Sequence, residues 1–158
     1  MSLFNRRLFC LSFAALAGCG FTPVYGPGGS AEGLRGRIDF ATPADEEGAA
    51  LVRRLEDRLG RTTTGDLKMT AEIRLKEAAL GFLPDGELSR FNVDGQVDWE
   101  LRDSAGRAVA AGQERSFTSY SATSTTVATT FAQRDARRRL MVILADRIIA
   151  DLVSRDLS

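Results

Sequence analysis

Histidine is absent from the 158 residues of this chain, which narrows the chemistry that its side chains can perform. The absence excludes Ser-His-Asp and Cys-His nucleophile pairs and every metal site that uses an imidazole ligand. The sequence also contains no phosphate loop, no C-x-x-C pair and no H-E-x-x-H motif. Asp94 and Asp98 form the one conspicuous acid pair, but four residues along a strand span about 13 Å, too far for a glycosidase pair. We therefore predict no enzymatic activity, no cofactor and no metal ion.

Cys19 is the side chain whose surroundings predict a covalent modification. Arg6 and Arg7 precede a short apolar run over 8–16, and small residues then lead directly to Cys19. This order of positive charge, apolar run and L-A-G-C resembles the lipobox of bacterial lipoproteins, in which the cysteine is joined to a diacylglyceryl group and the chain is cleaved before it. An ordinary secretory signal with a chance cysteine is the alternative. The pattern predicts a signal peptide over 1–18, lipidation of Cys19 and no transmembrane helix.

The residues around the cysteine also bear on where the protein resides. Gly20 follows Cys19, whereas an aspartate there often retains lipoproteins at the inner membrane, so we expect the periplasmic side of the outer membrane. Arg6 and Arg7 resemble a twin-arginine signal, and the sequence leaves the general secretory and twin-arginine routes both open. Residues 19–33 are rich in glycine and proline and predict a tether, which leaves a single domain over 34–158.

Three segments predict the strands of a sheet with one solvated face. Apolar and polar residues alternate strictly over 67–77 and over 91–102, as in antiparallel strands that bury one face. A turn at 103–106 predicts a returning strand over 107–120, and 34–40 reads as a shorter strand. The two strictly alternating strands are long enough to extend beyond a compact core.

Two helices complete the predicted domain. Thr42 and Pro43, followed by three acidic residues, predict a helix start, and Gly60 predicts its end. A second helix is expected over 131–153, and the Ser/Thr-rich stretch 116–130 is either a loop or a strand end. The fold class is α+β, in the order β-α-β-β-β-α, with an antiparallel four-stranded sheet and both helices packed on one face.

Arginines supply the remaining candidates for binding. Equal numbers of acidic and basic residues argue against a nucleic-acid partner. Guanidinium groups match phosphate geometry, so the arginines of the long hairpin are candidate ligands for a phosphorylated lipid, although solvated strand edges also explain them. These candidates are Arg90, Arg102, Arg107 and Arg115. A second group near the start of the last helix either binds an anion or reflects a general preference for arginine over lysine: Arg134, Arg137, Arg138 and Arg139.

The chain resembles the LptE family of lipopolysaccharide-assembly lipoproteins. The resemblance rests on L-A-G-C-G-F over 16–21 with P-V-Y-G over 23–26, on the order of elements, and on F-A-Q-R-D-A over 131–136. It implies a subunit that plugs a large outer-membrane barrel, the LPS-assembly protein LptD, and assists transport and insertion of lipopolysaccharide. Only Cys19 carries over as a functional position.

Two other features leave the function open. A free-standing lipoprotein that binds or senses a lipid is the alternative to a barrel plug, and it would need an apolar cavity under the sheet. Phe82 and Leu83 at the turn between the long strands either tuck onto the core or insert into a partner. Stable co-purification with a barrel would separate the two functions.

Overall fold

The computed structural model describes residues 32–82, 88–122 and 125–155. The signal peptide, Cys19, the tether up to residue 31 and the turn residue Leu83 lie outside these ranges. The elements in order are the 3-10 helix η1 (Glu32–Leu34), β1 (Ile38–Phe40), α2 (Glu46–Leu59), β2 (Leu67–Phe82), β3 (Leu88–Asp103), β4 (Ala108–Ser121) and α3 (Thr126–Ser154). This is the predicted α+β order.

The four strands form one sheet in the order β1-β2-β3-β4. β2 to β4 pair antiparallel as predicted, but β1 pairs parallel to β2, so the expectation of a wholly antiparallel sheet is wrong at this edge. α2 is the reason, because a helix between two strands carries the chain back to the end of the sheet where the first strand began. The sheet is therefore mixed, with one short parallel edge.

The long strands extend beyond the alternating segments 67–77 and 91–102 that predict them. β2 and β3 each span 16 residues and β4 spans 14. The β3–β4 turn is fixed by the Asp103 carboxylate, which accepts hydrogen bonds from the backbone N–H groups of Ala105 and Arg107, both at 2.9 Å. Gly106 completes the turn at φ 78°, a conformation that costs glycine little.

Both helices begin at places that differ from the prediction. Asp45, not Thr42, caps α2 by accepting a 2.7 Å hydrogen bond from the backbone N–H of Gly48. Thr125 caps α3, so this helix begins at Thr126 and includes most of the second half of the Ser/Thr-rich stretch. The first half belongs to β4, which ends at Ser121. The Thr125 hydroxyl accepts a bond from the backbone N–H of Ala128, one of the groups that the helix itself cannot satisfy. The hydroxyls of Thr129 and Thr130 donate to backbone carbonyls one turn earlier.

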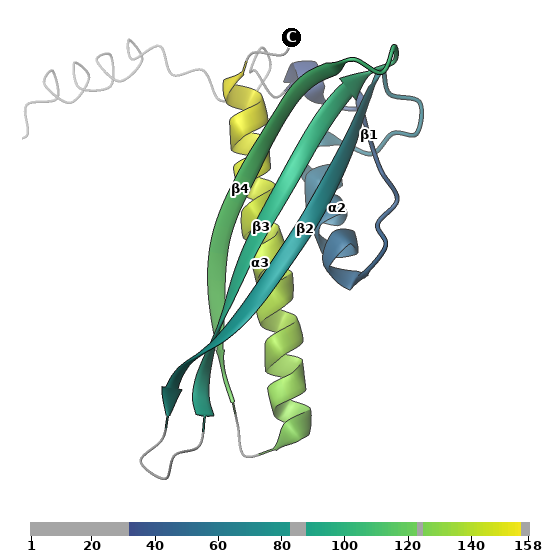
Figure 1. The fold of residues 1–158 in the computed structure, drawn as a ribbon. Coiled ribbons are helices and arrows are strands. Elements are labelled where there is room, and N and C mark those ends of the chain that lie inside the picture. Colours follow the sequence, from purple (N-terminus) through teal and green to yellow (C-terminus); the bar gives the residue numbers. More distant parts are fainter. Residues whose placement is uncertain (1–31, 83–87, 123–124, 156–158) are drawn as a thin grey trace, which may run out of the picture.

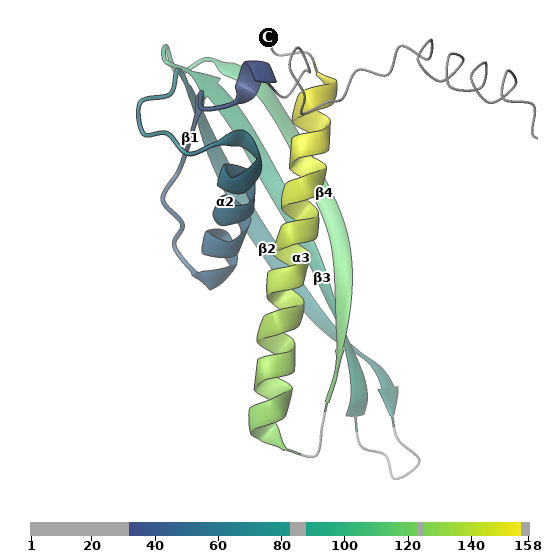
Figure 2. The same cartoon turned by 180° about the vertical axis from the view of Figure 1, so that it is seen from behind.

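α2 and α3 lie on the same face of the sheet, and α3 runs along nearly its whole length (Figure 1; Figure 2). The core between the layers is entirely apolar. Gly95 lets α3 approach β3 closely, since an added Cβ would lie 2.8 Å from a methyl of Leu140. The largest fully buried side chains are Leu34, Ile38, Leu51, Leu55, Leu59, Leu101, Leu140, Met141, Leu144, Ile148, Ile149 and Leu152. No helix in the described ranges combines the length and the apolar character needed to cross a bilayer.

Candidate functional site

The sheet face that the helices leave uncovered contains a basic pocket at the middle of the long strands. We call it the outer-face pocket. It has a volume of about 470 Å³ and is lined by Arg74, Leu75, Lys76, Asp94, Gly95, Gln96, Arg115, Ser116, Phe117 and Arg147. The strand register builds it, because Arg74, Gln96 and Arg115 are cross-strand neighbours, as are Lys76, Asp94 and Phe117. Residues far apart in the sequence thus meet on one face.

Three of the pocket's four cations make no ion pair with a carboxylate in the part of the chain that the structure describes. The Arg115 Nε donates a 3.0 Å hydrogen bond to the neutral side chain of Gln96. Arg147 reaches over the sheet edge from α3 and donates a 2.8 Å bond to the Arg115 carbonyl. Lys76 has no polar partner among the described residues. The pocket therefore offers positive charge that is free to bind an anion.

The fourth cation and the neighbouring acids are engaged with one another. Arg74 pairs with Glu72 at 2.8 Å and with Asp98 at 2.7 Å. Hydrogen bonds from Gln113 and Gln96, together with the nearby Arg74 and Arg115, hold the pKa of Asp98 below its ordinary value. Glu72 and Asp98 balance Arg74, and Asp94, which lies opposite Lys76 on β3, accepts a 2.8 Å hydrogen bond from Asn92. The cations Lys76, Arg115 and Arg147 outnumber this remaining acid, so the pocket keeps an excess of positive charge.

Phe117 gives the outer-face pocket an apolar component. Its ring is 67% exposed although it lies on an otherwise polar face, and no described aromatic residue stacks on it. An exposed aromatic beside unpaired cations suits a ligand that carries both an anionic head and an apolar body. A phosphorylated lipid has this chemistry, and the pocket contains no group arranged for bond cleavage.

The four arginines that the sequence singled out are not brought together. Arg102 and Arg107 lie at the β3–β4 turn, where they pair with Glu100 at 2.8 Å and with Asp103 at 2.7 Å. Arg90 lies about 40 Å away along β3 and donates a 3.3 Å bond to the Ser119 hydroxyl. Only Arg115 lies in the outer-face pocket.

The arginine cluster of α3 is occupied by intramolecular contacts. Arg138 and Arg139 both pair with Asp135 one turn earlier. Arg137 points to the sheet, where it contacts Glu77 of β2 at 2.7 Å and Glu47 of α2 at 3.2 Å. The cluster begins a third of the way along α3, because the helix starts earlier than predicted. These contacts favour a structural role for this part of the helix.

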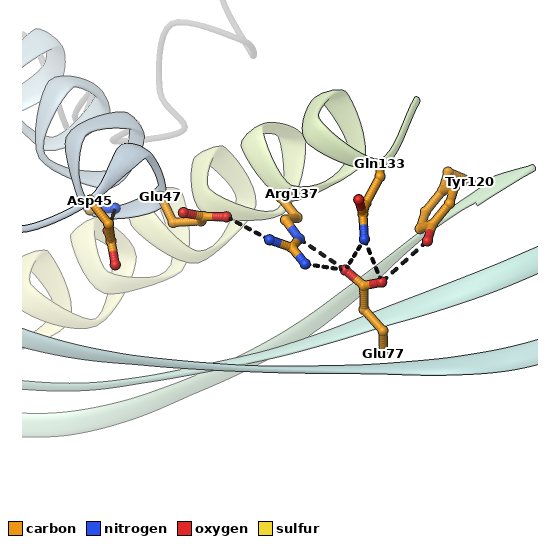
Figure 3. A network of polar contacts seen from close by, with 7 residues as sticks. Asp45, Glu47, Glu77, Tyr120, Gln133 and Arg137 are labelled. Carbon is orange, nitrogen blue, oxygen red and sulfur yellow. Dashed lines mark hydrogen bonds and ion pairs between the residues drawn. The ribbon is translucent and has the colours of Figure 1, made fainter. Parts of the chain in front are cut away.

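Glu77 is the centre of the network that Arg137 completes (Figure 3). Its carboxylate accepts hydrogen bonds from Arg137, from the Gln133 amide at 2.8 Å and from the Tyr120 hydroxyl at 3.2 Å. Burial alone would raise the pKa of Glu77, but these three donors outweigh it and hold the pKa below its ordinary value. The network ties β2, β4 and both helices together.

Sequence reasoning missed the contributions of Lys76, Phe117 and Arg147. The alternation of β2 does place Lys76 on its polar face together with Arg74, and this pattern could have identified Lys76 as a candidate. Arg147 could not be found in this way, because it comes from the helix layer and curls around the β4 edge. The described residues contain no group of three or more acidic or cysteine side chains positioned to hold a metal ion.

Comparison with known proteins identifies the family. The solved structures similar to this chain include a lipoprotein of Caulobacter crescentus, with 24% identity, a TM-score of 0.68 and coverage of 83% of this chain and 98% of that one. Rare lipoprotein B of Shewanella oneidensis follows, with 14% identity, a TM-score of 0.58 and coverage of 76% and 94%. A minor lipoprotein of Acinetobacter baumannii has 16% identity, a TM-score of 0.54 and coverage of 75% and 89%. At these identities the likeness establishes a shared fold.

The sequence itself gives the more specific result. No curated protein sequence matches the chain at a significant level. The family profile that does match is LptE, described as lipopolysaccharide-assembly, and it covers residues 37–152, well over half of the chain. The chain therefore belongs to the LptE family.

Proposed function

We propose that this chain is a non-catalytic outer-membrane lipoprotein that serves lipopolysaccharide assembly as the partner and plug of the LptD β-barrel. The family match over residues 37–152 is the observation that carries the proposal. The three similar lipoprotein structures support the same architecture for the domain.

Lipidation at Cys19 attaches the protein to the periplasmic side of the outer membrane. A single acyl chain binds a membrane only marginally, whereas a multiply acylated cysteine anchors a domain stably. We expect radiolabelled palmitate to be incorporated into the wild-type chain and not into Cys19→Ala. Cys10→Ala is the matched control and should be labelled normally, since Cys10 lies in the segment removed with the signal peptide. Labelling of Cys19→Ala would contradict the assignment.

The shape and polarity of the domain support a place inside a barrel. Lumen-facing surfaces of outer-membrane barrels are polar, and the uncovered sheet face carries charged and amide side chains along all three long strands. Its strands extend well past α2 (Figure 1), which gives the domain an elongated form. An elongated domain with a largely polar face fits a polar lumen.

The outer-face pocket supports direct contact with lipopolysaccharide. Lys76, Arg115 and Arg147 would contact phosphate groups, and Phe117 would contact the start of an acyl chain. This assignment replaces the dispersed set of four hairpin arginines by one of its members and three new residues. It leaves Arg102 and Arg107 as turn residues whose charges are already balanced.

Binding of purified lipopolysaccharide to the detergent-solubilised lipoprotein tests the pocket. A hydrogen bond to a charged group contributes about 1.5–3 kcal/mol, and tenfold in affinity corresponds to about 1.4 kcal/mol. We therefore expect Lys76→Ala and Arg115→Ala each to weaken binding by about tenfold. Arg102→Ala and Arg107→Ala are the matched controls and should bind as the wild type does. If Arg102→Ala and Arg107→Ala lost binding while the pocket variants kept it, the pocket assignment would be wrong and the binding site would lie at the β3–β4 turn.

The alternative of an independent lipid carrier has less support. A carrier would enclose the lipid in an apolar cavity between the layers. The cavity that the structure contains there, between α2 and β2, has a volume of about 270 Å³. Small-molecule sites usually have about 300–1,000 Å³, so this one is too small for a lipid with several acyl chains.

A further inference from the structure

β2 has a long free edge on the side that faces away from β3. β1 covers only its first residues, where the backbone N–H of Leu67 donates to the Arg37 carbonyl at 3.1 Å and the Met69 carbonyl accepts from Ala41 at 3.0 Å. The backbone N–H and C=O groups of successive strand residues point alternately to the two sides of the strand. The odd-numbered residues after Met69 therefore also direct both groups away from β3. They are Ala71, Ile73, Leu75, Glu77 and Ala79. Within the described ranges, their backbone N–H and C=O groups have no partner on this side.

The sequence itself ends the pairing with β1. In the parallel ladder, the next hydrogen bond to the Ala71 carbonyl would come from the backbone N–H of residue 43. The last bond of this ladder is from the Ala41 N–H to the Met69 carbonyl. Pro43 has no N–H group, so the ladder cannot resume at Ala71. Beyond β1, the edge is open among the described residues.

The opposite edge of the sheet is partly covered by side chains of α3. β4 is the other edge strand, and its outward carbonyls at Arg115 and Ser119 accept hydrogen bonds from Arg147 at 2.8 Å and Arg139 at 3.4 Å, both from α3. Proteins usually cover or block a long edge in this way because a free one pairs with other chains. Two outward carbonyls of the β4 edge thus bond to arginines of α3, whereas the β2 edge beyond β1 has no such partner among the described residues.

The free edge adjoins an apolar cavity on the helix side. Phe40, Leu51, Val52, Leu55 and Ile73 contribute apolar surface to its volume of about 270 Å³. The inward side chains of β3 that face α3 are fully buried, such as Val93 and Val97. At the cavity, Met69 of β2 is buried beside β1, but beyond β1 Ala71 is exposed and Ile73 is half-buried. Inward side chains of β2 therefore remain partly exposed here, where a further strand could bury them.

The solvent side of the same edge is positively charged. Lys68, Arg74 and Lys76 project from the outer face of β2. Arg74 is already paired with Glu72 and Asp98, whereas Lys76 makes no ion pair among the described residues. Residues directly opposite on adjacent strands lie about 4.5–5.5 Å apart, so a strand added here would place its own side chains against these cations. Acidic side chains on that face of the added strand would be favoured.

We propose that the free edge of β2 is a β-augmentation site for an extended segment of a partner protein. The segment alternates apolar residues, which enter the cavity under α2, with acidic or neutral polar residues, which face Lys76. Main-chain hydrogen bonds to the odd-numbered residues of β2 provide affinity, and the cavity selects side chains at alternate positions. The inference rests on the function proposed above, because the LptD barrel would be the partner protein that contributes this extended segment.

Backbone hydrogen exchange with single-residue resolution tests the pairing in the full lipoprotein, alone and in its complex with the barrel. We expect the amides of Ala71, Ile73 and Leu75 to exchange at least about tenfold more slowly in the complex, because they become hydrogen-bonded. The even-numbered amides of β2 already bond to β3 and serve as the internal reference. A complex that forms with no slowing at these amides would overturn the augmentation site and leave the barrel partnership standing. Failure to form any complex would overturn the partnership and, with it, this site.

Proline substitution gives an independent test. Ala71→Pro removes an outward N–H without touching the β2–β3 ladder, and we expect it to reduce the yield of complex at least about tenfold. Ala111→Pro is the matched control, because Ala111 is also exposed and its N–H points away from β3 at the opposite edge. Ala71→Lys, which places a charge at the cavity mouth and keeps the backbone intact, should act in the same direction. Normal complex formation by folded Ala71→Pro and Ala71→Lys would contradict the proposal. So would slow exchange at these amides in the lipoprotein alone together with a dimer mass, since a second copy would then occupy the edge.

Discussion

Replacement of Glu77 by glutamine removes the charge at the centre of the network that joins the two layers. The Glu77 carboxylate accepts two hydrogen bonds from Arg137, at 2.9 and 2.7 Å, and further bonds from Gln133 and Tyr120. Glutamine has nearly the same shape but one acceptor oxygen and no charge. Arg137 then keeps only Glu47, at 3.2 Å, as an ionic partner.

The expected loss follows from how exposed the pair is. The Glu77 and Arg137 side chains are 23% and 36% exposed, so the pair lies between a surface ion pair and a buried one. Exposed pairs contribute about 0.2–1 kcal/mol, and removal of one partner of a buried pair costs about 3–5 kcal/mol. We expect Glu77→Gln to lower the free energy of unfolding by about 2 kcal/mol. For a domain of this size, that corresponds to a fall in Tm of roughly 6–10 °C.

Thermal unfolding of the purified lipoprotein, followed by circular dichroism, measures this loss. Glu72→Gln is the matched control, because Glu72 is 67% exposed and pairs on the outer face, and its free energy of unfolding should change by less than about 0.5 kcal/mol. The difference between wild type and Glu77→Gln should also depend on pH. Since the pKa of Glu77 is lowered in the folded state, its contribution is complete above the ordinary carboxyl range and disappears as the pH falls through the lowered value. Equal stability of Glu77→Gln and wild type at pH 7 would refute the reasoning.

Three further predictions concern other parts of the domain. Gly65→Ala should lower the free energy of unfolding by about 2–3 kcal/mol in urea titrations, because an added Cβ would lie 2.0 Å from the backbone carbonyl oxygen of Arg37, and an unchanged midpoint would contradict this packing. Leu140→Ala should cost about 2–5 kcal/mol in the same assay through the cavity it leaves between α3 and β3, and a cost below 1 kcal/mol would show that the site collapses. The phenol of Tyr120 should titrate above its ordinary pKa, because burial and the adjacent Glu77 disfavour its charged form. Ultraviolet titration of Tyr25→Phe, which leaves Tyr120 as the only tyrosine, measures this directly, and an ordinary pKa would contradict the network in Figure 3.

The long strands and the layer order could be predicted because they depend on local alternation. Strict period-two patterns fix which side chains of β2 and β3 face the helices, and no tertiary information is needed for that. The direction of β1 could not be predicted from three residues, since it depends on where α2 returns the chain. The start of α3 was also missed, because a threonine-rich turn suits a loop, a strand end and a helix cap equally well.

The binding residues were harder to predict than the fold. Each hairpin arginine lies in a similar alternating pattern, so residue spacing alone does not separate Arg115 from Arg102. Strand register distinguishes the two arginines. Arg102 donates a hydrogen bond to Glu100 near the β3–β4 turn. Arg115 donates one to Gln96 and lines the outer-face pocket with Lys76 and Phe117. Cross-strand register depends on turn geometry and bulges, which lie outside what residue spacing along one strand can reveal.

The central claim is that this lipoprotein acts as the partner of an outer-membrane barrel. Purification of the tagged full-length protein from detergent-solubilised outer membranes, with mass spectrometry of what accompanies it, tests this claim most directly. We expect a large β-barrel of the LptD type in a one-to-one ratio, retained through washing at high salt. Recovery of the lipoprotein alone, with or without bound lipid, would contradict it.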